Sequence, residues 1–225
     1  SLRLANALEH IKKNKIKLKK FRYDICVISD WASKGHFQNF TRDKESSGLY
    51  FDEGMAQTVK YAIKFCMKRN KKFIFAMKSK KRNSIEQEKE LDFYKKYLSG
   101  PEYKFLTANT TKDRLGKFVS YITMFESKVA ISTISTMLGE NLALGNKVFA
   151  CNLTKMDIMD FPNGGICSIK NCDYKKFEKK LLYILSINKK KYISKLSKNK
   201  NYIINYNNKI STIKILEKII AKSIS

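Results

Sequence analysis

The chain has 225 residues, 43% of them hydrophobic and 12% aromatic, so it can bury a core of its own and is not a disordered segment. Its formal net charge is +26, but only six of the 46 basic residues are arginine. Nucleic-acid sites that read bases or grip phosphates draw on arginine, so no specific nucleic-acid partner is expected. General attraction to polyanions, including an anionic membrane surface, is expected at this charge.

Cysteine usage and hydropathy bear on the compartment. The five cysteines lie mostly in apolar runs, which predicts buried free thiols in a reducing cytoplasm. No apolar run approaches the roughly 18 residues of a membrane span, and the first residues lack the pattern of a signal peptide. We therefore expect a cytoplasmic protein, in peripheral contact at most with the inner face of a membrane. No spacing typical of a metal site occurs, so no metal or other cofactor is expected.

The chain opens with a predicted connecting helix over residues 1–20 and a buried strand from Tyr23 to Ser29. Asp30 then begins a long polar loop that also contains His36. These residues follow the carboxyl end of a strand, where open α/β sheets bind ligands. Asp30 and His36 are therefore candidate catalytic residues, although His36 can equally be an ordinary surface histidine.

The middle of the chain alternates between helical and strand patterns. The predicted helices cover 55–69, 84–98 and 112–125, and the predicted strands cover 72–77 and 103–107. A cationic run that includes Lys78 and Lys80 follows the strand ending at residue 77. These two lysines could clamp a phosphate, but a lysine-rich composition also produces such runs by chance.

The stretch from Lys128 to Asn152 is the most informative part of the chain. It predicts a compact helix with one short buried strand before it and another after it. Ser135 is the predicted N-cap of that helix, and helix-start amides with nearby hydroxyls bind phosphate well. The turn carries the hydroxyls of Ser132, Thr133, Ser135 and Thr136.

Glu140, further along the same predicted helix, could accept hydrogen bonds from sugar hydroxyls. The simpler interpretation is that the hydroxyls only cap the helix and that Glu140 is a solvated surface residue. The sequence pattern leaves both interpretations open.

Beyond this stretch the pattern predicts a glycine-containing turn at 162–165, a sixth strand over 166–169 and a helix capped by Asp173. Residues 188–225 are predicted to form a C-terminal helical extension. The alternation of strands and helices predicts an α/β, Rossmann-like domain over residues 21–187. Its mostly parallel sheet would have about six strands, covered by helices on both faces.

Two segments resemble a known family. The run S-T-M-L-G-E-N-L-A-L-G-N-K-V and the segment from Cys172 to Leu196 are similar to the C-terminal, donor-binding half of GT-B fold glycosyltransferases of bacterial surface and capsular polysaccharide biosynthesis. The resemblance implies a nucleotide-sugar donor, a glycan or lipid-linked acceptor and no bound metal. It also implies that Ser132, Thr133, Ser135 and Thr136 surround the donor phosphates and that Glu140 holds the ribose. From their position alone, Lys78 and Lys80 would offset charge on the departing nucleotide.

GT-B enzymes have two Rossmann-like halves, and the resemblance covers only one. We therefore expect a missing N-terminal acceptor domain or a partner half. The sequence begins without methionine, as a piece of a longer protein would. Two alternatives stay open: a nucleotide-sugar epimerase of similar architecture, and a basic Rossmann-like nucleic-acid-binding module. The scarcity of arginine and of stacking aromatics weighs against the module.

Overall fold

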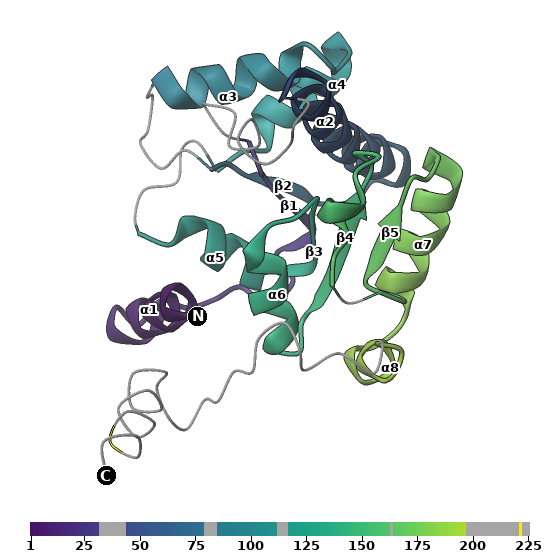
Figure 1. The fold of residues 1–225 in the computed structure, drawn as a ribbon. Helices are drawn as coiled ribbons and strands as arrows, with labels where there is room; N and C mark the ends of the chain where they lie inside the picture. Colours follow the sequence, from purple (N-terminus) through teal and green to yellow (C-terminus); the bar gives the residue numbers. More distant parts are fainter. Residues whose placement is uncertain (32–43, 79–84, 112–116, 163, 197–220, 222–225) are drawn as a thin grey trace.

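The computed structural model describes residues 1–31, 44–78, 85–111, 117–162, 164–196 and 221 (Figure 1). Five parallel strands form one sheet in the order β2-β1-β3-β4-β5. They are β1 (Tyr23–Ile28), β2 (Phe73–Ala76), β3 (Ser127–Ser132), β4 (Lys147–Asn152) and β5 (Ser168–Lys170). The predicted α/β, Rossmann-like class is confirmed, with five strands in the described part of the chain instead of about six.

Helices cover both faces of this sheet (Figure 1). α2 and α7 pack together on one face, while α5 and α6 lie together on the other. Both faces of the strands are therefore buried, and every position of β2 and β4 is buried, including the polar Lys147 and Asn152 at the two ends of β4. The helices are α1 (Leu2–Lys13), α2 (Lys44–Arg69), α3 (Ile85–Lys95), α4 (Gly100–Ala108), α5 (Val119–Phe125), α6 (Thr136–Ala143), the 3-10 helix η1 (Asp157–Met159), α7 (Tyr174–Ser186) and α8 (Lys189–Ser194).

The strand predicted over 103–107 is wrong, because these residues belong to helix α4. The amide and the hydroxyl of Ser99 both donate to the carboxylate of Glu102, at 2.8 and 2.9 Å, and Pro101 stands in the first turn. Such a box and an early proline are helix-start signals. Gly100 and Pro101 therefore open a helix, whereas the sequence pattern suggested that they only ended the preceding one.

α2 is longer than the predicted helix, since it begins at Lys44. The predicted polar loop extended to Gly54, but this glycine lies inside the helix, where close packing requires it. A Cβ atom at Gly54 would stand 2.5 Å from the backbone nitrogen of Thr154. The hydroxyl of Thr58, one turn further on, donates to the carbonyl of Cys151 at 3.2 Å. Glycine here lets α2 lie directly against the end of β4.

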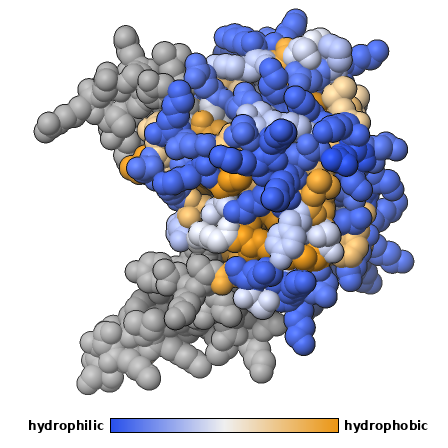
Figure 2. All heavy atoms as spheres, turned by 90° about the vertical axis from the view of Figure 1, so that its right-hand side faces the viewer, coloured by the Kyte–Doolittle hydropathy of each residue, from blue (hydrophilic) through white to orange (hydrophobic). Residues whose placement is uncertain are grey.

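The two ends of the described chain contribute to the same core. Leu4 and Ala7 of α1 and Tyr192 of α8 are fully buried in the main hydrophobic cluster. Seen from the side of α7 and β5, hydrophilic side chains dominate the surface and apolar areas between them are small (Figure 2). Within the described ranges, every helix is too short or too polar to cross a lipid bilayer.

Candidate functional site

The sheet order reverses direction between β1 and β3. The chain passes from β1 to β2 on one side and then returns to β3 on the other side of β1. The register pairs Val27 with Ile131, so the carboxyl ends of these two strands lie side by side. Doubly wound sheets bind ligands outside the carboxyl ends of the strands at such a reversal. We therefore take this edge as the candidate site.

Asp30 and the serine–threonine turn meet at this edge, although the chain separates them widely. The Oδ2 atom of Asp30 accepts a hydrogen bond of 2.5 Å from the hydroxyl of Ser132. It also accepts from the backbone amides of Thr133 and Ile134, at 2.9 and 3.2 Å. In this structure the turn therefore holds a carboxyl group of the chain itself, and its predicted contact with a ligand phosphate stays a prediction. Asp30 thus engages the hydroxyl of Ser132 and the amide of Thr133, two residues expected beside the donor phosphates. The hydroxyl of Thr133 is buried and has no hydrogen-bond partner among the described residues.

The environment of Asp30 changes its acidity. Burial raises the pKa of its carboxyl group above the ordinary value, while the bonds from Ser132 and the two amides and the charge of Lys78 oppose that rise. Lys78 therefore acts on the same edge of the sheet. Its exposed side chain follows the end of β2, as the prediction of a phosphate-clamping lysine requires.

The chain leaving β1 is held by a second set of contacts. The hydroxyls of Ser29 and Tyr94 lie 3.2 Å apart, and the amide of Trp31 donates to Ser29 Oγ at 3.2 Å. Tyr94 is fully buried, and Trp31 packs against the hydrophobic core. These contacts orient the segment that presents Asp30 to the turn.

α6 begins directly after the turn. Ser135 is its N-cap, as predicted, but its hydroxyl makes no capping hydrogen bond. Thr136, the first residue of the helix, is exposed, whereas Ser132 and Thr133 are each 1% exposed. The first-turn amides of a helix have no intrahelical partner and carry the positive end of the helix dipole. Ser135 and Thr136 are therefore the hydroxyl residues best placed to meet a ligand.

Glu140 is not the solvated residue that the simpler interpretation suggested, since it is 3% exposed. Its Oε2 atom accepts a hydrogen bond of 2.6 Å from the hydroxyl of Tyr121 on α5. Burial, and to a lesser extent this bond, raises the pKa of Tyr121. The guanidinium of Arg3 lies 5.9 Å from the centre of the Tyr121 ring. The contact ties α6 to α5. The assigned ribose role of Glu140 stays a prediction, because it requires the carboxylate to turn from Tyr121 toward a ligand.

Two predicted site residues, His36 and Lys80, lie outside the described residues, and their assignments stay predictions. Within the described ranges, no three His, Cys, Asp or Glu side chains gather as a metal ion would require.

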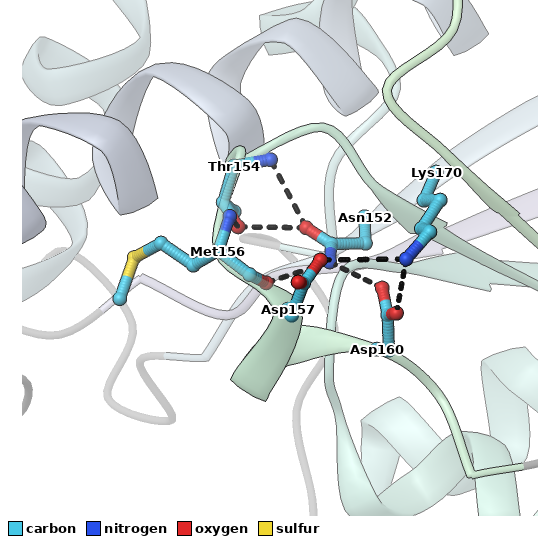
Figure 3. A network of polar contacts seen from close by, with 6 residues as sticks. All are labelled: Asn152, Thr154, Met156, Asp157, Asp160 and Lys170. Atoms are coloured by element: carbon cyan, nitrogen blue, oxygen red, sulfur yellow. Dashed lines mark hydrogen bonds and ion pairs between the residues drawn. The ribbon is translucent and has the colours of Figure 1, made fainter.

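A second polar cluster, which the sequence analysis missed, lies at the carboxyl end of β4 (Figure 3). Asn152 accepts from the amide and hydroxyl of Thr154, at 3.1 and 2.6 Å, and donates to Met156 O and Asp160 Oδ1, at 2.8 and 2.7 Å. Lys170 pairs with Asp157 and Asp160 at 3.3 and 3.0 Å. In the sequence, the one feature that could have indicated this cluster is the asparagine that ends the buried strand β4.

A hollow of about 410 Å³ adjoins this cluster and is lined in part by Gly164, Gly165 and Lys180. The ammonium group of Lys180 donates to the carbonyl of Gly165 at 2.7 Å and also to that of Ser168. Because the hydrogen-bonding capacity of Asn152 is filled and both lysines are engaged by the chain itself, the cluster holds the loop after β4 in place.

The chain matches no protein-family model, and no match was found among curated proteins or among solved structures.

Proposed function

We propose that this chain is the donor-binding half of a nucleotide-sugar-dependent glycosyltransferase that transfers a sugar onto a glycan or lipid-linked acceptor in surface polysaccharide synthesis. The observation that carries the proposal is the position of the α6 start. It opens at the reversal between β1 and β3, from a turn that Asp30 holds rigid. A helix start at this place in a doubly wound sheet is well suited to a diphosphate.

The donor phosphates would contact Ser135 and Thr136. The hydroxyl of Ser135 is not used as a cap, and Thr136 is exposed. Ser132 and Thr133 would not contact the phosphates. The Ser132 hydroxyl and the Thr133 amide would act indirectly, because they fix the Asp30 carboxylate and with it the shape of the turn. The family resemblance of the run from Ser135 to Val148 supports the same assignment.

Transfer of a sugar from such a donor requires stabilisation of the leaving nucleoside diphosphate. When the bond between the sugar and the diphosphate breaks, negative charge grows on the phosphate oxygens. Preorganised amides, hydroxyls and a cation facing those oxygens lower the barrier. The α6 amides, the Ser135 and Thr136 hydroxyls and Lys78 would supply these groups.

Asp30 is better suited to positioning than to proton transfer. Its Oδ2 atom is held by three donors, which fixes the carboxylate against the turn. The base that deprotonates the acceptor hydroxyl would then come from the acceptor half, supplied by an upstream domain or a partner. Asp30 as catalytic base stays a prediction with less support than the phosphate contacts.

Isothermal titration of the purified chain with UDP, CMP, GDP and a duplex oligonucleotide tests the proposal. We expect one of the three nucleotides to bind, and Ser135→Ala to weaken its binding about fivefold, as for the loss of one hydrogen bond. Ser194→Ala, which removes an exposed hydroxyl of α8, is the matched control and should leave the affinity unchanged.

Two results would overturn the proposal. The first is that none of the three nucleotides binds. The second is that the duplex binds with a steep salt dependence while the nucleotides do not, as expected for a nucleic-acid-binding module.

A further inference from the structure

A basic hollow lies at the opposite edge of the sheet, where β1 and β2 begin. Its volume is about 460 Å³, and it is called here the amino-edge pocket. Arg22 and Tyr23 line it at the start of β1, and Lys71 and Lys72 line it just before β2. The parallel register that pairs Ile25 with Phe73 brings these two strand starts together.

The charge of Lys71 helps to lower the pKa of Asp24, but neither lysine of the amino-edge pocket is in a close ion pair within the described ranges. Among the described residues, no carboxylate forms an ion pair with the side chain of Lys71 or Lys72. Two acidic residues lie nearby but are already engaged. Asp24 pairs with Lys128 at 2.7 Å and accepts from the backbone amide of Lys72 at 2.9 Å, and Glu126 lies 3.8 Å from Arg22.

The same pocket has an aromatic wall. Phe105 of α4 lines it with Phe73, and their ring centres are 5.5 Å apart. Phe73 is buried, whereas Phe105 and Tyr23 are only half-buried. The guanidinium of Arg22 lies 5.4 Å from the centre of the Tyr23 ring. Cations beside an apolar surface suit a ligand that combines an anionic group with an apolar or aromatic body.

We propose that the amino-edge pocket binds a phosphate ester, with the phosphate between Arg22, Lys71 and Lys72 and the ester body against Phe105. The phosphate can belong to a soluble compound or to a lipid headgroup. This site is separate from the one at the start of α6, because it uses the amino ends of the strands instead of their carboxyl ends.

Two probes distinguish these sources. Binding of phenyl phosphate, a soluble ester with an aromatic body, is measured by titration calorimetry of the full chain, and lipid binding by sedimentation with vesicles that contain phosphatidylglycerol. We expect the double variant Lys71→Gln/Lys72→Gln to lose about tenfold in affinity for the probe that binds. Arg22→Gln, a change at an exposed side chain, should give a smaller loss in the same direction.

The matched control is Lys175→Gln/Lys176→Gln on α7, since both lysines are exposed and the net charge falls by the same amount. Loss confined to the Lys71/Lys72 variant supports the site. The probe affected then identifies a soluble phosphate or a lipid headgroup. The proposal is overturned by equal loss in both double variants or by binding of neither probe. It is also overturned if phenyl phosphate binding survives in the Lys71/Lys72 variant and no vesicles bind.

Discussion

The hydroxyl of Ser132 lies 2.5 Å from the Oδ2 atom of Asp30 and joins the ends of β3 and β1 across 102 residues of sequence. With the amides of Thr133 and Ile134 it surrounds one carboxylate oxygen. The shape of the turn before α6 therefore depends on a side chain delivered by another strand. A ligand at the start of α6 would therefore bind a turn whose geometry the Ser132–Asp30 bond has already fixed.

Removing the Ser132 hydroxyl should destabilise the protein. In Ser132→Ala the Asp30 carboxylate stays partly buried with one donor fewer, and we expect the free energy of unfolding to fall by about 1–3 kcal/mol. Urea unfolding followed by circular dichroism measures this. Ser194→Ala is the control and should stay within about 0.5 kcal/mol of the parent chain. Equal effects would mean that the Ser132–Asp30 bond adds nothing to stability.

Asp30→Asn should reveal a pH dependence. Because burial raises the pKa of Asp30 above 3.8, the folded chain keeps this proton at pH values where the unfolded chain has lost it. The contribution of Asp30 to stability is thus fully present below the unfolded pKa and is lost as pH rises through the folded pKa. The parent chain should lose stability relative to Asp30→Asn across that window. Urea unfolding of both chains from pH 4 to 7 tests this, and a difference that does not change with pH contradicts it.

Tyr121→Phe should also destabilise the fold. It removes the hydroxyl that donates to Glu140 at 2.6 Å and leaves a buried carboxylate with one partner fewer, at a cost of about 1–3 kcal/mol in unfolding free energy. Glu140→Gln keeps an oxygen that accepts from Tyr121, so its thermal unfolding should change less. If Glu140→Gln unfolds at a lower temperature than Tyr121→Phe, the charge of Glu140 matters more than its bond to Tyr121.

Gly54→Ala tests the contact between α2 and the end of β4. The new Cβ atom would stand 2.5 Å from the nitrogen of Thr154 and 2.6 Å from the carbonyl carbon of Leu153, so the helix or the loop must move. We expect a loss of about 1–3 kcal/mol in unfolding free energy, as for other overpacked sites. Gly100→Ala is the control, because nothing lies within 4 Å of its added Cβ atom. Similar stability of the two variants would show that α2 and the loop accommodate the methyl group.

Asn152→Asp should loosen the loop after β4. The change replaces the two donors to Met156 and Asp160 with an acceptor and places a second negative charge beside Asp160. We expect a loss of about 2–3 kcal/mol in unfolding free energy, together with faster amide hydrogen exchange in residues 153–160. Unchanged exchange in that loop would mean that Lys170 alone holds it through its two ion pairs.

Sequence patterns were sufficient to predict the fold class, because a buried strand is a short apolar run that can be identified without knowing which strands it pairs with. β1, β3 and β4 each lie within about two residues of their predicted bounds. The pattern failed over residues 103–107, which were predicted as a strand. Ser99 and its partner Glu102, just before this run, begin a helix instead. The pattern also failed over residues 44–54, which it assigned to the long loop after Asp30, whereas they form the first part of α2 and Gly54 packs against Thr154.

The chain by itself determined that a hydroxyl-rich turn opens a helix between two buried strands and that this turn suits an anion. Local chemistry is enough for that, since the residues concerned are neighbours in sequence. Only the tertiary structure decided that the turn holds the carboxyl group of Asp30 and that Glu140 accepts from Tyr121. It also decided that the Ser135 hydroxyl makes no capping bond and that Thr136 is exposed. These facts depend on the order in which the strands lie side by side, which brings together residues that no local pattern connects.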